Sequence, residues 1–190
     1  LQNTAKKKIN YTPNTKKVIL ELSSYFSEIE SLSDLSKGIY LFGPVGSGKT
    51  TMMQAFSTWK HTKKKFNIVS TRDIQWRFTK EGYDVLVMHS THSYEYKQNG
   101  HSRDNRPLIY CYDDFGAEGK SKHFGNDCLV IEEILQDRYR EMQLTGMKTH
   151  VTSNLGKDWS LIEDIYGTRI RSRCREMFNI IELNMEDNRK

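Results

Sequence analysis

The chain has 190 residues, and its 29 Lys and Arg against 24 Asp and Glu give a formal net charge of +5. This length fits one domain, and 36% apolar with 28% charged residues exclude an intrinsically disordered chain. No apolar run approaches the roughly 20 residues that span a bilayer, and the N-terminus lacks the zones of a signal peptide. We therefore expect a globular protein of the cytoplasm that does not contact a membrane.

The cysteines and the N-terminus bear on compartment and domain organisation. Cys111, Cys128 and Cys174 are scattered and form no C-x-x-C pair, so we expect buried thiols rather than a zinc or redox site. Residues 1–12 are polar and lysine-rich, which predicts a solvated tail before a core domain at 13–190. Because the chain begins at Leu1 rather than Met, we expect it to be excised from a longer polypeptide, with a preceding N-terminal module missing.

The hydrophobic pattern predicts helices that alternate with strands. Thr12 and Pro13 are typical of a helix start, and apolar residues at three- and four-residue spacing continue to Ile29. Gly38–Phe42 predicts a buried strand, followed by a glycine-rich turn and a helix over 50–59. Residues 89–106 give no clear pattern. The remaining strands are expected at 66–70, 108–112, 148–152 and 177–183. The remaining helical segments are expected at 74–83, 125–142, 159–165 and 168–176. This alternation predicts a three-layer α/β fold with a parallel sheet of five strands.

One segment after the first strand matches the phosphate-binding pattern G-x-x-x-x-G-K-[ST]: Gly43-Pro44-Val45-Gly46-Ser47-Gly48-Lys49-Thr50. Glycines allow the backbone N–H groups to surround phosphates closely, and a helix start adds its positive dipole end. Lys49 would reach the β- and γ-phosphates, the Thr50 hydroxyl would bind Mg²⁺, and Thr51 lies in the same helical turn. The segment predicts an ATP site over Gly43 to Thr51.

A second acidic element should lie at the end of a neighbouring apolar strand. Asp113 and Asp114 follow the apolar run at 108–112. Asp113 would hold Mg²⁺ directly or through water, and Asp114 could act as the general base towards the attacking water. The alternative is an ordinary pair of solvated acids in a strand-to-helix loop.

Two other nucleotide-binding classes share part of this motif. Residues 113–116 also satisfy the D-x-x-G of GTPases, and residues 114–116 spell the D-F-G of protein kinases. The spacing at 154–158 is not the N-K-x-D that recognises guanine, and no H-R-D precedes the D-F-G. Both classes are therefore rejected.

Taken together, these motifs resemble AAA+ ATPases of the bacterial helicase-loader branch, DnaC-like, and the related IstB-like transposition ATPases. The resemblance runs from about residue 10 to 183, and the segments that support it are 38–50, 113–118, 149–154 and 166–173. Two departures stand out: Asp rather than the frequent Glu at position 114, and an end about seven residues after the last strand, which leaves no room for a helical lid. The loader branch lacks that lid.

The resemblance implies roles for two further positions. Asn154, after a core strand, would be sensor 1 and orient the hydrolytic water; the residues alone favour equally a helix cap before 157–165. Arg173 would be the arginine finger that reaches the ATP of a neighbouring subunit, with Arg169, which shares its helix face, as the second choice. The remaining alternative is a basic, solvated helix face.

Basic residues also suggest weak binding of single-stranded DNA. Two lysine clusters could contact the phosphate backbone: Lys60 with Lys63 to Lys65 after the phosphate-loop helix, and Lys120 with Lys122 in the loop after the acidic strand. Stacking on bases would come from the polar region, through Tyr94, Tyr96, His101 and Arg103. Ordinary surface lysines explain these clusters equally well.

The function expected from the resemblance is a slow ATPase that self-associates through its ATP sites and loads a replicative helicase onto DNA. The alternatives are an IstB-like ATPase that delivers a transposase to DNA, and a self-contained small-molecule kinase. A kinase would need a lid and an acceptor pocket.

Overall fold

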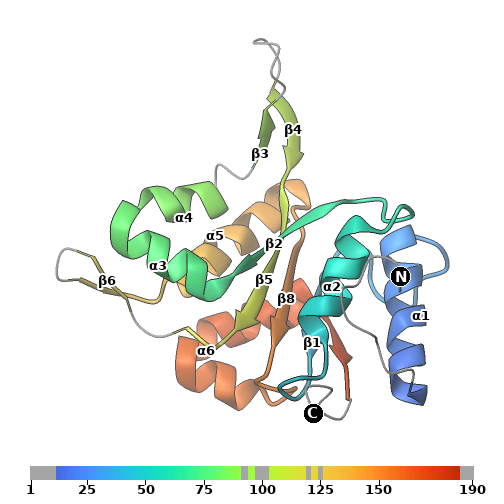
Figure 1. Cartoon of the computed structure of the whole chain (residues 1–190). Coiled ribbons are helices and arrows are strands. Elements are labelled where there is room, and N and C mark those ends of the chain that lie inside the picture. The colour runs from blue at the N-terminus through green and yellow to red at the C-terminus, as the bar shows by residue number, and fades with distance from the viewer. Residues whose placement is uncertain (1–11, 91–93, 97–102, 119–120, 124–125, 185–190) are drawn as a thin grey trace.

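A five-stranded parallel sheet forms the centre of the protein. The computed structural model in Figure 1 describes residues 12–90, 94–96, 103–118, 121–123 and 126–184. The strand order is β2-β5-β8-β1-β9 and every pairing is parallel, which confirms the predicted sheet. In that order the strands are β2 (Phe66–Ser70), β5 (Ile109–Phe115), β8 (Thr149–Ser153), β1 (Gly38–Phe42) and β9 (Phe178–Glu182).

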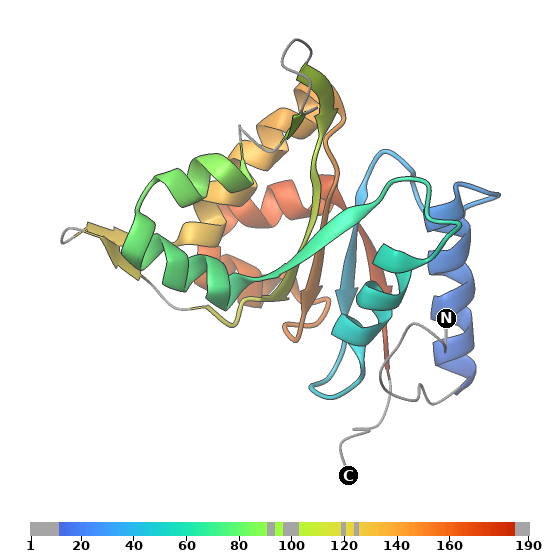
Figure 2. The ribbon, with the colours of Figure 1, turned by 45° about the horizontal axis from the view of Figure 1, so that its top comes forward.

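Helices cover both faces of this sheet, as Figures 1 and 2 show. One face packs against α1 (Pro13–Ser27) and α2 (Lys49–Thr58), with a core that includes Leu22, Phe26 and Phe56. The opposite face packs against α3 (Thr71–Glu81), α4 (Asp84–His89), α5 (Val130–Thr145) and α6 (Trp159–Met177). The three-layer α/β prediction is therefore confirmed.

The main departures from the predicted elements are two short hairpins. β3 (Tyr94–Tyr96) pairs antiparallel with β4 (Arg103–Pro107) in the region that gave no pattern. β6 (Ser121–His123) pairs with β7 (Asn126–Cys128), so the helix predicted from residue 125 begins only at Val130. β3, β6 and β7 have three residues each, which is too short for apolar alternation to indicate a strand, and β4 (Arg103–Pro107) is polar apart from its final proline.

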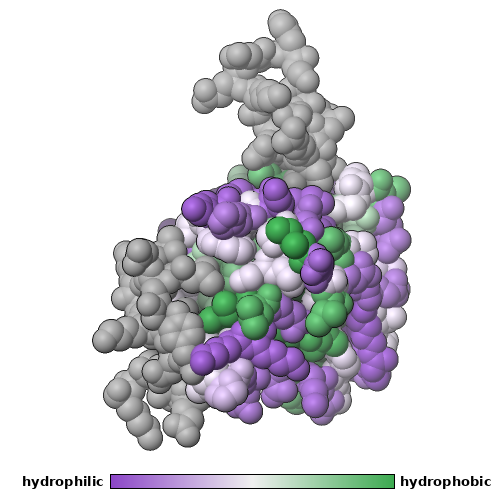
Figure 3. Space-filling view, turned by 90° about the vertical axis from the view of Figure 1, so that its right-hand side faces the viewer, coloured by the Kyte–Doolittle hydropathy of each residue, from purple (hydrophilic) through white to green (hydrophobic). Residues whose placement is uncertain are grey.

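The first helix begins and ends with local hydrogen bonds. The Thr12 hydroxyl accepts from the N–H of Thr15 at 3.1 Å, and Pro13 occupies the first turn, as predicted. Glu28 is left-handed at φ 57° and ends the helix, so Ile29 lies beyond it and is 63% exposed. The expectation that the apolar helix face continues to Ile29 was therefore wrong. Figure 3 views the side of the molecule on which α1 lies, where hydrophobic residues form several spots among hydrophilic ones.

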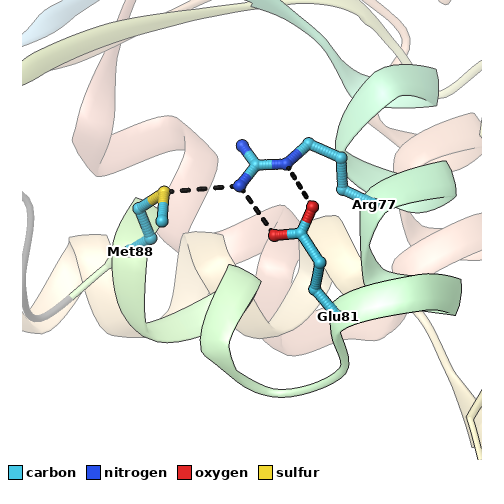
Figure 4. A network of polar contacts seen from close by, with 3 residues as sticks. All are labelled: Arg77, Glu81 and Met88. Carbon is cyan, nitrogen blue, oxygen red and sulfur yellow. Dashed lines mark hydrogen bonds and ion pairs between the residues drawn. The ribbon is translucent and has the colours of Figure 1, made fainter.

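The helices α3 and α4 are joined by a small polar network, shown in Figure 4. Arg77 donates through Nε and Nη2 to the two carboxylate oxygens of Glu81, at 3.1 and 2.9 Å, and Nη2 also contacts the sulfur of Met88 at 3.5 Å. The hydrogen bonds from Arg77 lower the pKa of the Glu81 carboxyl. The bidentate pair orients the arginine across the α3–α4 turn.

The cysteine prediction holds for the side chains that the structure describes. Cys111 and Cys174 are free and buried, and burial raises the pKa of Cys174 to about 12. The side chain of Cys128 and residues 1–11 of the predicted tail lie outside the described residues. No helix in the described part of the chain combines the length and apolar character needed to cross a membrane.

Arg138 is a fully buried charge that joins the amino-terminal ends of two strands. Its guanidinium donates to the Thr149 hydroxyl at 2.6 Å and to the carbonyls of His89, Leu108 and Lys148 at 3.1, 3.0 and 2.8 Å. These carbonyls lie where a loop or helix end meets the sheet. One side chain therefore satisfies backbone acceptors that would otherwise be buried without a donor.

Replacing this arginine should destabilise the fold strongly. We expect Arg138→Ala to lower the free energy of unfolding by about 3 kcal/mol or more, because several buried acceptors lose their donor. The control is Arg140→Ala, two residues along α5, which removes only an exposed ion pair with Asp137. This control should change the free energy of unfolding by less than about 0.5 kcal/mol. Urea unfolding of both variants measures the difference, and equal stabilities would contradict this role of Arg138.

Candidate functional site

The predicted phosphate loop connects β1 to α2 at the carboxyl edge of the sheet. The N–H of Gly43 donates to the carbonyl of Ser153 at 3.3 Å, which ties the start of the loop to the end of β8. Gly46 and Gly48 have φ of 84° and 88°, a conformation that favours glycine. Gly48 precedes α2 and has no side chain to accept hydrogen bonds from the first N–H groups of this helix.

Lys49 is buried at the centre of this loop. Its ammonium donates to the carbonyls of Gly43 and Pro44, each at 2.9 Å, and to the side-chain oxygen of Asn154 at 2.7 Å. Only 5% of the residue is exposed. The carbonyls at the start of the loop and the Asn154 side chain therefore hold the ammonium against the loop that was predicted to bind phosphate.

Asp113 links the phosphate loop to the acidic strand. The Thr50 hydroxyl contacts both of its carboxylate oxygens, at 2.8 and 3.0 Å, and the Thr152 hydroxyl donates to Oδ1 at 2.5 Å. The two predicted metal ligands are thus in direct contact. The interpretation of Asp113 as an ordinary solvated acid does not fit this position.

The strand β5 runs through both acids instead of ending before them, and its pairing with β8 shifts register between Tyr112 and Phe115. Asp114 is left-handed there, with φ 59°. Its N–H donates to the Thr152 hydroxyl at 3.1 Å, and its carbonyl accepts from the Thr71 hydroxyl at 3.1 Å. Two threonines therefore hold a conformation that is unfavourable for most side chains, and irregularities of this kind re-aim side chains beside functional sites.

Asn154 follows β8 and meets the phosphate loop through Lys49. The helix-cap alternative is wrong, because the residue that caps α6 is Asp158, whose carboxylate accepts from the N–H of Ser160 at 2.9 Å. The amide of Asn154 is instead placed at the carboxyl edge of the sheet, next to the predicted phosphate position.

The arginines of α6 lie apart from this cluster. Arg173 donates to the side chain of Gln136 at 3.1 Å and lies 5.0 Å from the ring centre of Tyr139, both on α5. Arg169 is exposed. Within the part of the chain that the structure describes, the hydrogen bonds and ring contacts of these two arginines do not reach the phosphate loop of their own chain.

Three residues of the site neighbourhood escaped the sequence analysis. Thr152 holds both acids, and Glu118 with Tyr166 connects the end of β5 to α6. Glu118 stood inside a quoted motif, but its role depends on a contact 48 residues away. Thr152 and Tyr166 also lie in quoted segments, 149–154 and 166–173, but only the strand register and the helix packing reveal their partners.

The donor set fits a magnesium ion. The Thr50 hydroxyl and the Asp113 carboxylate offer hard oxygen atoms, and Mg²⁺ is typically bound through one or two protein oxygens, phosphate oxygens and water. Among the described residues, no group of three or more His, Cys, Asp or Glu side chains gathers as a metal site. Such an ion would therefore be shared between these two residues and the phosphates.

Comparison with known proteins identifies the fold. No family model matches the chain, and no curated protein matches it in sequence. The DnaC helicase loader matches with a TM-score of 0.60 at 17% identity, over 95% of this chain and 96% of that one. DnaI matches with a TM-score of 0.59 at 20% identity, over 97% and 88%. AMPPCP-bound DnaA from Aquifex aeolicus matches with 0.56 at 16% identity, over 93% and 49%.

The chain therefore has the α/β fold of an AAA+ P-loop core. More narrowly, its fold is similar to those of the helicase loaders DnaC and DnaI and of DnaA. At these identities the likeness is one of fold. The matched DnaA structure is bound to AMPPCP. In this chain, the cluster of Lys49, Thr50, Asp113 and Asn154 lies where the nucleotide-binding pattern was predicted.

The shared threonine gives a test of the site geometry. We expect Thr152→Val to weaken the Mg²⁺-dependent part of ATP binding about tenfold, because both acids lose the hydroxyl that orients them. Thr149→Val, at the other end of β8, removes a similarly buried hydroxyl that contacts Arg138 and should spare nucleotide binding. The measurement is the affinity for a fluorescent ATP analogue, once with Mg²⁺ and once with EDTA. If the ratio of these two affinities is the same in Thr152→Val as in the wild-type protein, the role of Thr152 is refuted.

Proposed function

We propose that this protein is an AAA+ ATPase that binds ATP with Mg²⁺, hydrolyses it slowly when alone, and acts in DNA replication as a loader of a replicative helicase. The observation that supports this proposal most is the meeting of Lys49, Thr50, Asp113 and Asn154 at the carboxyl edge of the sheet. The similarity of the fold to DnaC and DnaI supports the choice of a loader. Such a role would be carried out in the cytoplasm.

In the proposed mechanism the backbone N–H groups of the loop Gly43 to Gly48 and the start of α2 bind the phosphates. Lys49 exchanges its contacts with the loop carbonyls for the β- and γ-phosphate oxygens. Bound Mg²⁺ would supply charge neutralisation on the phosphates, held by Thr50 and Asp113. Asp114 accepts the proton of the attacking water, and the amide of Asn154 orients that water.

The site is completed by an arginine from a neighbouring subunit. Arg173 contacts α5, and Arg171 pairs with Glu163 within α6, so an arginine that reaches ATP would belong to another copy of the chain. Arg173 is the proposed finger and Arg169 the second choice. Use of Arg173 would require it to leave Gln136, whereas Arg169 is already exposed.

This arrangement predicts complementation between two inactive variants. Lys49→Ala lacks the ATP site but retains the arginines, and Arg173→Ala lacks the finger but retains the ATP site. We expect each alone to show little hydrolysis and the mixture to recover about tenfold or more, as removal of an arginine finger costs at least that factor. Phosphate release by the mixture, against each variant alone at the same total concentration, measures the recovery.

Two outcomes would revise the proposal. A fully active Lys49→Ala variant would refute the assignment of the phosphate loop. If Arg173→Ala keeps its concentration-dependent hydrolysis while Arg169→Ala loses it, the finger is Arg169, and Arg169→Ala replaces Arg173→Ala in the mixture.

A basic groove supports the proposed binding of single-stranded DNA. The groove, of about 640 Å³, lies at the amino-terminal edge of the sheet and is lined by Lys63, Lys64, Lys65, Lys148 and Glu28, among others. Burial, with Lys64 nearby, lowers the pKa of Lys148 to about 8. Four lysines face one carboxylate, so phosphate oxygens would relieve the repulsion between these cations. Tyr94, Tyr96, His101, Arg103, Lys120 and Lys122 remain untested, because their side chains lie outside the described residues.

Charge-matched variants test the groove. We expect weak binding of an oligothymidine strand. The double variant Lys63→Ala/Lys65→Ala should make the slope of log K against log salt concentration shallower by about 1.4, since each phosphate contact contributes about 0.7 to this slope for single strands. Lys16→Ala/Lys17→Ala removes two exposed lysines of α1 and should leave the slope unchanged. Fluorescence anisotropy at several salt concentrations measures both; absence of binding at low salt would remove DNA from the proposal.

The proposed partner is a replicative helicase, and the alternative partner is a transposase. A loader and an IstB-like transposition ATPase would use the same ATP site, so the geometry of that site does not separate them. Affinity purification of the protein from its own cells distinguishes them. Recovery of a replicative helicase supports loading, and recovery of a transposase supports the alternative.

A further inference from the structure

A buried carboxylate lies just beyond the nucleotide site and takes no part in the contacts described for it. Glu118 is 8% exposed, and its Oε2 accepts from the N–H of Gly116 at 3.0 Å. Its other carboxylate oxygen accepts a hydrogen bond from the hydroxyl of Tyr166 on α6, which is 3% exposed. Both oxygens of one buried acid therefore bridge the turn after β5 and the helix α6.

The same tyrosine is held a second time, through its ring. Tyr166 stacks on Phe115, with ring centres 4.8 Å apart and planes inclined by 6°. Phe115 directly follows Asp114 in the chain. Burial and the Glu118 carboxylate raise the pKa of the Tyr166 hydroxyl well above its usual range, so it remains a donor at physiological pH. The end of β5 and one point of α6 are thus joined both by stacking and by a charge-assisted hydrogen bond.

Tyr166 occupies the point at which α6 changes direction. The next residue, Gly167, has φ 83° and ψ 169°, which is not helical and divides α6 into two segments. Arg169 and Arg173 belong to the second segment. An ion pair between Arg171 and Glu163, at 2.6 Å, spans the same division. The place where Tyr166 is anchored therefore determines where the segment with the arginines begins.

The two elements joined by this bridge do not depend on it equally. The end of β5 is also held by hydroxyl groups of Thr71, Thr152 and Ser153, which bond Asp113, Asp114 or the carbonyl of Phe115. The second segment of α6 follows a glycine with a non-helical backbone, and its side-chain bonds from Arg173 and to Glu176 are made to α5. Loss of the bridge should therefore displace α6 more than β5.

We propose that Glu118 and Tyr166 are positioning residues that fix the arginine-bearing segment of α6 relative to the acidic strand, and so align the arginine that one subunit presents to the ATP of the next. This inference rests on the proposed function. The contacts of Glu118 and Tyr166 are made with Gly116, with Phe115 and with each other, so their effect should appear in the turnover of assembled subunits and not in nucleotide affinity.

The mixture of Lys49→Ala and Arg173→Ala subunits separates the two ends of the bridge. Tyr166→Phe keeps the ring on Phe115 and removes only the hydroxyl. Placed in the Lys49→Ala subunit, which supplies the arginine, it should lower kcat of the mixture about tenfold and leave KM for ATP within about twofold. Placed in the Arg173→Ala subunit, which supplies the ATP site, it should leave both values within about twofold.

Two further variants make the test specific. Glu118→Gln in the Lys49→Ala subunit should act in the same direction, because one amide oxygen replaces two acceptors. Tyr25→Phe serves as the control for stability, since it also removes a buried tyrosine hydroxyl, one that donates to the carbonyl of Lys37 at 2.5 Å. It should lower the free energy of unfolding in the same way and leave hydrolysis by the mixture unchanged.

Each outcome bears on one hypothesis. The positioning role in α6 would be overturned if Tyr166→Phe lowers kcat of the mixture equally in both placements or in neither. It would also be overturned if kcat falls only when the substitution is in the subunit with the ATP site. If wild-type protein does not hydrolyse ATP, or the unmodified mixture shows no recovery, the proposed function itself fails. The asymmetry between the two placements is therefore the result that supports the inference.

Discussion

The geometry of the site depends on the hydrogen bonds of the Asp113 carboxylate. This carboxylate is in hydrogen-bond contact with Thr50 at the start of α2 and with Thr152 in β8, and so joins the phosphate loop, the acidic strand and the neighbouring strand. Parallel pairing brings the carboxyl ends of these strands to one edge. Because Thr152 also accepts from the N–H of Asp114, one hydroxyl sets the position of both acids.

Buried charged groups mark both edges of the sheet, and each is surrounded by oxygen atoms. Arg138 satisfies strand-end carbonyls at the amino-terminal edge, with no carboxylate among its hydrogen-bond partners, and therefore serves the fold. Lys49 at the opposite edge is held by loop carbonyls that are also near the predicted phosphates. The two cations differ in whether another group can take the place of their hydrogen-bond acceptors. The acceptors of Arg138 are enclosed, whereas those of Lys49 border an exposed part of the loop, at Pro44 and Val45, where phosphate oxygens could replace them.

Under the proposed function, the placement of the arginines would make a single copy of this fold a poor catalyst. The phosphate loop and the arginine-bearing segment of α6 make separate sets of contacts, and the bridge from Glu118 to Tyr166 connects them through the end of β5. An arginine that acts on a neighbouring subunit has to be held at a defined angle from its own sheet. A buried, charge-assisted hydrogen bond with a stacked ring holds that angle better than exposed ion pairs would.

From the sequence alone, local patterns identified the phosphate loop, the acidic pair, the five strands and the class of fold, because glycine spacing and apolar periodicity act over a few residues. They did not reveal the hairpins β3–β4 and β6–β7, whose strands have only three to five residues, or the extension of β5 through Asp114. Only the tertiary structure decided that Asn154 faces Lys49 instead of capping α6, that Thr152 holds both acids, and that Glu118 meets Tyr166. These contacts join residues 38 to 105 positions apart, and strand register and helix packing, which no local pattern encodes, bring them together.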